Sequence, residues 1–198
     1  MKTRRPALAA LAAATAALVV TTLLSACTGK DAVNQTAGGQ FRFVSGTSLG
    51  KTYPVASRKA AGDFSGNLLD GGTMKLSQDA GKVVVINFWA TWCGPCTTET
   101  PQFDAVYRQT KAKGVDFIGI DTKDIRNKAQ AFVKDNDITY PIVFDEQGMT
   151  ALALGKIPAL GLPFTVLVDK KQRIAAVYLL TLSAKDLQPV LDKLLVET

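Results

Sequence analysis

The chain has 198 residues, a formal net charge of +6 and no histidine. Lys2, Arg4 and Arg5 supply half of that charge within an N-terminal stretch that holds no acidic residue, so the remainder carries only +3. No basic cluster with interleaved aromatic residues is present, and we therefore predict no nucleic-acid binding. Three cysteines without a histidine are also too few for a structural zinc site, which needs four protein ligands.

Residues 1–26 have the layout of a secretory signal, because basic residues precede the alanine-rich apolar stretch Ala7 to Leu24. A stretch of 18 residues could also just span a bilayer as an uncleaved helix. Its end, Leu24-Ser25-Ala26-Cys27, resembles the lipobox of bacterial lipoproteins, in which the cysteine is acylated and becomes the new N-terminus. The resemblance implies lipidation at Cys27 and an anchor on the outer face of the cell membrane. Cys93 and Cys96 would then remain as a pair in a compartment where disulfides persist.

Residues 27–50 are polar and contain glycine, which predicts a flexible tether in which Phe41–Val44 could form a short strand. Residues 51–198 are enough for one domain with its own core. We predict that this part holds all of the regular structure that positions a functional site.

The elements predicted within this domain alternate between strands and helices. In chain order they are a hairpin of 64–69 with 73–76, a buried strand at 83–88, a helix at 93–112, a strand at 115–121, a helix at 125–135, a strand at 141–144, a short helix at 149–155, a strand pair at 164–169 and 174–178, and a helix at 184–195 capped by Ser183. This alternation, with antiparallel pairs at both ends, predicts an α/β fold with a central mixed β-sheet flanked by helices.

The tetrapeptide Cys93-Gly94-Pro95-Cys96 follows the buried strand and opens the next helix. A helix N-terminus stabilises a thiolate, and disulfide exchange needs a thiolate attacker with a second thiol nearby. We therefore predict an exposed attacking Cys93 and a less exposed resolving Cys96. Covalent haem is excluded because Thr97 stands where the attachment motif requires histidine. A purely structural disulfide would close a loop so short that it constrains the unfolded chain only slightly.

The segment Phe88-Trp89-Ala90-Thr91-Trp92 before this tetrapeptide resembles the thioredoxin superfamily. The sequence Cys96-Thr97-Thr98-Glu99-Thr100-Pro101 and the extra helix and strand within 124–144 are similar to the exported TlpA/ResA-type thiol-disulfide oxidoreductases. The similarity covers roughly residues 63–195. It implies a thioredoxin-like fold with an N-terminal hairpin and an extra inserted element.

The same resemblance implies an enzyme that exchanges disulfides with protein substrates through Cys93 and Cys96. It implies no bound cofactor, a redox partner in the membrane and, in many members, a role in cytochrome c maturation. Thioredoxin itself has a buried Asp where this chain has Asn87, which cannot exchange a proton. In TlpA/ResA-type proteins a glutamate in the first helix is implicated instead, and Glu99 matches it. Glu99 shares a helix face with Cys96. An exposed glutamate that only stabilises the positive end of the helix would explain this residue equally well.

Pro163 directly precedes a predicted strand, where the superfamily has a cis-proline beside the disulfide. The resemblance implies a cis bond between Leu162 and Pro163 and a substrate-binding surface that these two residues form with Trp92, Gly94 and Pro95. Packing alone would also explain Trp92. The residue after the proline is Phe164, where the family more often has a small hydroxyl residue, and a more apolar groove is expected.

Two other functions remain open at this point. Thiol peroxidases share the overall fold, but their Pro-x-x-x-Thr-x-x-Cys motif is not matched, because Ile86 and Ala90 precede Cys93 at these positions. A non-enzymatic, lipid-anchored metal carrier could use the two thiols, although no methionine cluster or histidine lies nearby. The direction of electron flow is also open, and the Gly-Pro dipeptide of reducing thioredoxins favours a reductase.

Overall fold

The computed structural model describes residues 50–155, 157 and 161–197. The predicted signal, the strand predicted at Phe41–Val44 and all of the tether except Gly50 lie outside these residues. In the described part of the chain, no helix combines the length and the apolar character that crossing a bilayer requires.

A six-stranded mixed sheet forms the centre of the described structure, with the strand order β1-β8-β7-β4-β5-β6. β4 pairs parallel with β5 and antiparallel with β7, and it is therefore covered by a strand on each side. The strands of this sheet are β1 (Lys51–Thr52), β4 (Val83–Trp89), β5 (Val115–Thr122), β6 (Ile142–Asp145), β7 (Phe164–Val168) and β8 (Ile174–Tyr178).

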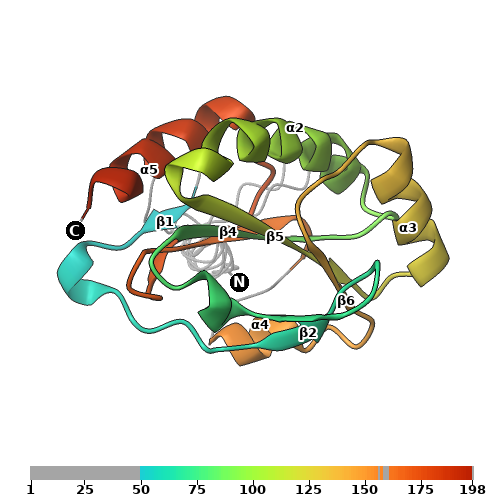
Figure 1. The fold of residues 1–198 in the computed structure, drawn as a ribbon, viewed down its shortest axis with the longest axis horizontal. Coiled ribbons are helices and arrows are strands. Elements are labelled where there is room, and N and C mark those ends of the chain that lie inside the picture. The colour runs from blue at the N-terminus through green and yellow to red at the C-terminus, as the bar shows by residue number, and fades with distance from the viewer. Residues whose placement is uncertain (1–49, 156, 158–160, 198) are drawn as a thin grey trace, which may run out of the picture. The chain divides into compact units, whose positions relative to one another are not determined.

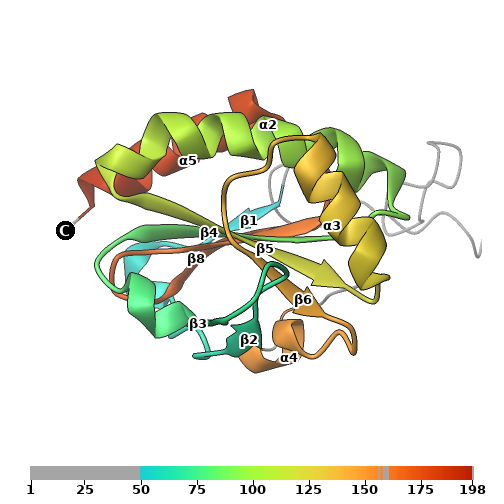
Figure 2. The same cartoon turned by 45° about the vertical axis from the view of Figure 1, so that its right-hand side comes forward.

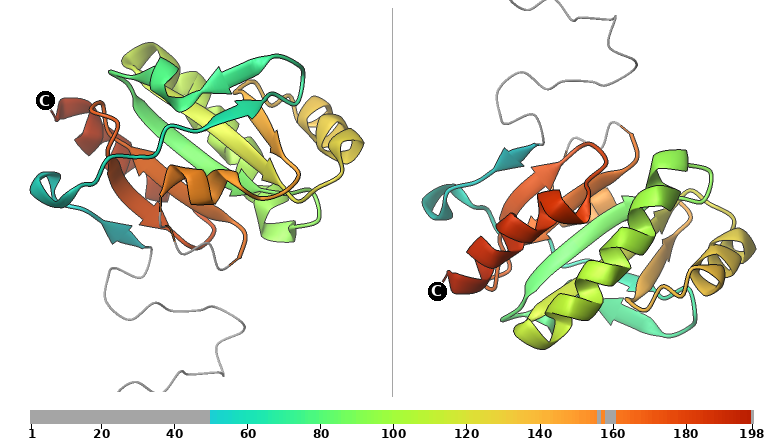
Figure 3. Two further views of the ribbon diagram at one scale, coloured as in Figure 1. Left: turned by 90° about the horizontal axis from the view of Figure 1, so that it is seen from below. Right: turned by 90° about the horizontal axis from the view of Figure 1, so that it is seen from above.

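Helices and a hairpin cover the two faces of this sheet (Figures 1 and 2). One face carries the helices α2 (Gly94–Thr110), α3 (Arg126–Asp135) and α5 (Ala184–Val196). The other face carries α4 (Thr150–Leu154) and the separate hairpin of β2 (Ser65–Asn67) with β3 (Thr73–Lys75). In Figure 3, α2 and α5 lie over the strands in the right-hand view, and α4 and β2 lie over them in the left-hand view.

The unbroken apolar run of β4 explains its central place. All seven of its residues are buried. Because successive strand residues point to opposite faces, Val85 and Trp89 belong to the apolar cluster beneath α2, whereas Ile86 and Phe88 belong to the cluster beneath the hairpin. A strand buried on both faces has no polar alternation, and the structure confirms this prediction.

The order and the type of the predicted elements from residue 64 onward are confirmed, and their ends differ by a few residues. α3, β6 and α4 lie between β5 and β7 and form the predicted inserted element. Ser183 caps α5 in a capping box with Asp186, as expected. The sequence did not predict β1 or the short 3-10 turns at Val55–Ser57, Leu76–Asp79 and Lys111–Lys113. β1 has only two residues and exists because it pairs with β8, so no periodic pattern marks it.

The two ends of the domain are joined by a buried ion-pair network around Arg58. Its guanidinium contacts Asp169 at 3.1 Å and also the carboxylate of Glu197, and its side chain is only 3% exposed. Asp169 additionally accepts a hydrogen bond from Arg173 at 2.9 Å. Removing a buried cation leaves its carboxylate partners without compensation, which typically costs a few kcal/mol.

We expect Arg58→Ala to lower the free energy of unfolding by about 3 kcal/mol, because Glu197 loses the guanidinium that donates to it and Asp169 keeps only Arg173 as a charged donor. Urea unfolding followed by tryptophan fluorescence measures this loss. Arg58→Lys is the matched control, since it keeps the charge but not the fork of donors. Its free energy of unfolding should lie between those of the wild type and Arg58→Ala. An Arg58→Ala protein as stable as the wild type would show that the network contributes nothing.

Candidate active site

The two cysteines of the tetrapeptide lie where β4 gives way to α2. Cys93 is the N-cap residue of α2, and its Sγ accepts a hydrogen bond from the backbone N–H of Cys96 at 3.3 Å. Pro95 occupies the first turn, where a missing N–H costs no intrahelical hydrogen bond. A backbone donor and the positive helix end thus both face the sulfur of Cys93, and both stabilise a thiolate there.

Cys93 and Cys96 form a disulfide bond, with their Cα atoms 5.2 Å apart. Cys93 is 6% exposed and Cys96 is fully buried, so the predicted order of exposure is correct. The prediction that Cys93 is exposed is wrong for this disulfide-bonded form. Its sulfur is bonded to Cys96, and both residues belong to the apolar cluster between the sheet and α2.

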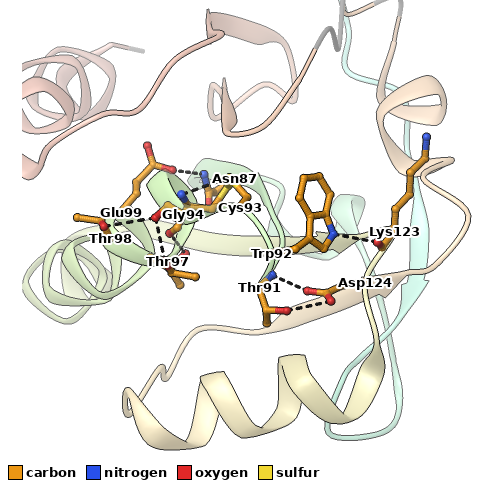
Figure 4. The surroundings of a disulfide bond; sticks show 12 residues. Asn87, Thr91, Trp92, Cys93, Gly94, Thr97, Thr98, Glu99, Lys123 and Asp124 are labelled. Atoms are coloured by element: carbon orange, nitrogen blue, oxygen red, sulfur yellow. Dashed lines mark hydrogen bonds between the residues drawn. A yellow bond between two sulfur atoms is a disulfide. The ribbon is translucent and has the colours of Figure 1, made fainter. Parts of the chain in front are cut away.

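Glu99 lies one turn further along α2 and is fully buried, so the interpretation as a surface glutamate is wrong. Its carboxylate accepts hydrogen bonds from Asn87 Nδ2 at 2.8 Å and from the backbone N–H of Leu182 at 2.6 Å. The same Asn87 amide also donates to Thr165 Oγ1 at 3.1 Å. Figure 4 shows Asn87 and Glu99 pointing toward one another next to Cys93.

Burial raises the pKa of Glu99 to about 7, although the hydrogen bonds from Leu182 and Asn87 act in the opposite direction. A carboxyl group with this pKa exists in both protonation states near neutral pH. It can therefore either accept a proton from a nearby thiol or return one.

Trp92, on the other side of Cys93, is 62% exposed. Its Nε1 donates to the backbone oxygen of Lys123 at 3.0 Å, and Thr91 donates from both N–H and Oγ1 to the carboxylate of Asp124 (Figure 4). Trp92, Ile125 and neighbouring residues line a surface hollow of about 540 Å³. An exposed indole held at one end is a fixed apolar surface next to the disulfide.

The peptide bond between Leu162 and Pro163 is cis, as predicted. Pro163 directly precedes β7, whose first residue Phe164 pairs with Phe88 of β4. Pro163 therefore lies at the edge of the sheet from which the active-site loop emerges. Phe164 stacks on Phe88 with ring centroids 4.0 Å apart and is buried, so it belongs to the core and does not line a groove.

Sequence reasoning did not find the residues that hold this site from other elements. Thr165 and Leu182 bond to Asn87 and Glu99, respectively. Asp124 and Lys123 bond to Thr91 and Trp92, and Asp121 lies against Asp124. One signal could have indicated the residues beside Thr91 and Trp92. Asp121 ends the apolar part of β5 and Asp124 follows the strand, and the carboxyl ends of the parallel strands β4 and β5 meet at one edge of the sheet.

Comparison with known proteins supports the fold and the class. Residues 51–195 match the family model Redoxin. A thiol-disulfide oxidoreductase ResA from Bacillus thuringiensis subsp. konkukian is 35% identical over 116 residues, which are 59% of this chain and 65% of that protein. The chain thus spans slightly less than two thirds of that relative's length. A ResA from Geobacillus thermodenitrificans is 31% identical over 71% of this chain and 79% of that protein.

Solved structures agree with this result. A DsbF homologue from Corynebacterium diphtheriae superposes with a TM-score of 0.71 at 37% identity, over 79% of this chain and all of that one. A secreted thiol-disulfide isomerase from Corynebacterium glutamicum gives a TM-score of 0.73 at 35% identity, over 81% of this chain and all of that one. The predicted thioredoxin-like fold is confirmed.

This fold, with a cysteine pair at a helix N-terminus, defines the class of thioredoxin-like dithiol proteins. The chain belongs to the Redoxin family and, within it, to the ResA-type thiol-disulfide oxidoreductases.

Proposed function

We propose that this chain is an extracytoplasmic oxidoreductase that exchanges disulfides with protein substrates through Cys93 and Cys96. The observation that carries the proposal is the position of Cys93, whose sulfur accepts a backbone hydrogen bond at the N-terminus of α2 and is bonded to the buried Cys96. The names of the ResA relatives and of the secreted C. glutamicum protein support the same activity.

The proposed cycle begins with the dithiol form. The Cys93 thiolate attacks one sulfur of a substrate disulfide, that bond breaks, and the other substrate sulfur leaves as a thiolate. Cys96 then gives up its proton and attacks the mixed disulfide at Cys93, which releases the second substrate thiol. The substrate gains two electrons and two protons, and Cys93 and Cys96 are oxidised to the disulfide. Run backward, the same steps oxidise a substrate.

We assign the proton of Cys96 to Glu99 in this cycle. Glu99 lies three residues beyond Cys96 on one face of α2 and has a pKa of about 7. Since Asn87 carries an amide in place of a carboxylate, it can orient Glu99 but cannot exchange the proton. Trp92, Gly94, Pro95, Leu162 and Pro163 are proposed to bind the substrate chain around the disulfide.

The placement outside the cytoplasm rests on the N-terminal sequence. We propose a signal peptide at residues 1–26, lipidation at Cys27, a tether at 27–50 and the catalytic domain at 51–198. We also propose a membrane redox partner, and the cysteines of apocytochrome c as one class of substrate.

Cys27→Ala is expected to move the protein from the membrane fraction to the soluble or secreted fraction, because stable anchoring requires the acyl chains that this thiol would receive. Fractionation and immunoblotting of cells that express each form measure the change. Ser25→Ala is a neighbouring control and should leave the distribution unchanged. Because an uncleaved apolar stretch could also hold Cys27→Ala in the membrane, the deciding measurement is the mass of the wild-type N-terminus. A wild-type Cys27 without acyl chains would overturn the lipid anchor without affecting the proposed chemistry.

The substrate class is tested with Cys96→Ser, which can form the mixed disulfide at Cys93 but cannot resolve it. We expect covalent complexes with proteins that disappear on reduction, and the double variant Cys93→Ser/Cys96→Ser should trap none. Mass spectrometry of the trapped proteins separates cytochrome maturation from general disulfide exchange. An empty trap together with peroxide consumption by the purified wild type would favour a peroxidase instead.

A further inference from the structure

Asp121, near the end of β5, is a carboxyl group buried without a hydrogen-bond donor in the described structure. It is fully buried, and among the residues that the structure describes no N–H or O–H group donates to either of its oxygens. Its side chain instead lies against the carboxylate of Asp124. Its register neighbours on the adjoining strands are Trp89 of β4 and Phe144 of β6, which do not titrate. A buried carboxylate without donors is costly, and a protonated carboxyl group in the same place is not.

Asp124 is the group that can accept a hydrogen bond from a protonated Asp121 carboxyl. The charged groups that act on Asp121 are Asp124 in the following loop and Arg126 at the start of α3. Burial raises the pKa of Asp121 to about 8, the negative charge of Asp124 adds to this rise, and Arg126 opposes it. Burial also acts to raise the pKa of Asp124, but the hydrogen bonds from Thr91 and Ile125 outweigh it and lower that pKa. The two shifts thus both favour the protonated form of Asp121 and the charged form of Asp124 near neutral pH.

Asp124 in turn holds the segment that precedes Cys93. It accepts from the N–H and, at 2.9 Å, from the Oγ1 of Thr91, and it also accepts from the N–H of Ile125 at 2.6 Å. Next to it, the indole of Trp92 donates to the backbone oxygen of Lys123. Figure 4 shows these contacts joining the loop after β5 to the two residues in front of Cys93.

We propose that Asp121 is a positioning residue for the active site, because its protonated carboxyl donates to Asp124 and so fixes the carboxylate that holds Thr91 and Trp92 beside Cys93. When Asp121 loses its proton to solvent, two negative carboxylates face each other. The Asp124 side chain is then repelled, and its bonds to Thr91 weaken. The reactive loop is therefore held firmly below about pH 8 and loosens above it. The effect of this Asp121–Asp124 contact on catalysis rests on the proposed function. The contact and its pH dependence do not.

The test uses the disulfide-bonded protein, in which no thiol titrates. We follow the backbone amide of Thr91 by nitrogen–proton NMR from pH 6 to pH 9.5. Its resonance should titrate with a midpoint near 8, and its exchange with solvent should rise about tenfold beyond the base-catalysed increase as the charged hydrogen bond is lost. Asp121→Asn places an amide donor against Asp124 at every pH, so this transition should vanish.

Three further measurements complete the test. Glu99→Gln removes the other nearby carboxyl that titrates close to neutrality, and Asp135→Asn changes an exposed aspartate on α3; both should keep the Thr91 transition. Carbon-13 titration of the Asp121 carboxyl in the wild type decides the matter if Asp121→Asn does not fold. A midpoint near 4 for that carboxyl, or an unchanged Thr91 transition in Asp121→Asn, would overturn the proposal. Because no turnover is measured, these outcomes are independent of whether the protein exchanges disulfides.

Discussion

Cys93→Ser is expected to abolish disulfide exchange, with turnover falling by about 10³-fold or more in a protein-disulfide reduction assay. A serine hydroxyl is not ionised at neutral pH and cannot form a mixed disulfide, so neither the backbone donor of Cys96 nor the helix end has a thiolate to stabilise. Cys96→Ser should also lose turnover, but it should retain the first half of the cycle and accumulate one mixed disulfide per protein molecule.

The contrast between the two variants is the decisive result. Both should fold, because each replaces sulfur by a smaller oxygen at the start of a helix and leaves the rest of the site intact. Iodoacetamide labelling across pH should show a reactive thiol in Cys96→Ser and a much less reactive one in Cys93→Ser. Equal reactivity of the two thiols, or turnover by Cys93→Ser within tenfold of the wild type, would rule out the assigned roles.

The second large effect concerns stability and pH through Glu99. Its pKa lies near 4.5 in an unfolded chain and at about 7 in the folded protein. Below pH 4.5 the carboxyl is protonated in both states, and the contribution of Glu99 to the free energy of unfolding is at its maximum. Between pH 4.5 and 7 only the folded state keeps the proton, so stability falls as pH rises. The whole change is roughly 3 kcal/mol, because each pKa unit corresponds to about 1.36 kcal/mol.

Urea unfolding of the disulfide form from pH 4 to pH 8.5 measures this effect against Glu99→Gln. The glutamine can fit, since a flipped Asn87 amide would present to it the Oδ1 atom that has no partner in the described structure. The wild type should lose roughly 3 kcal/mol more than Glu99→Gln over this range. Asp121 titrates in both proteins and cancels in the difference.

Glu146→Gln, at an exposed glutamate, is the matched control and should retain the wild-type slope. Parallel curves for the wild type and Glu99→Gln would mean that folding does not raise the pKa of Glu99. In the reduced form, Glu99→Gln should also shift the titration of the thiol pair, and an unchanged thiol titration would remove Glu99 from the proposed proton path.

The sequence by itself determined the features that are encoded locally. The apolar run Val83–Ile86, continued by Phe88 and Trp89, made β4 a central strand, and the cysteine tetrapeptide shortly after it placed both thiols at a helix start. The alternation of strand and helix patterns determined the α/β class. The resemblance of the motif, with Pro163 before a strand, was sufficient to predict the cis bond. Each of these patterns is read from residues that are neighbours in the sequence, one element at a time.

Only the tertiary structure decided the electrostatics of the site. Glu99 is buried and bonded by residues from other elements: the N–H of Leu182, 83 residues away along the chain, donates to it, and Asn87 links it to Thr165. The proton that we place on Asp121 follows from the way the sheet buries this side chain and from Asp124 beside it. A pKa depends on burial and on charges contributed by other elements, and no periodic pattern in the sequence records how residues so far apart are brought together.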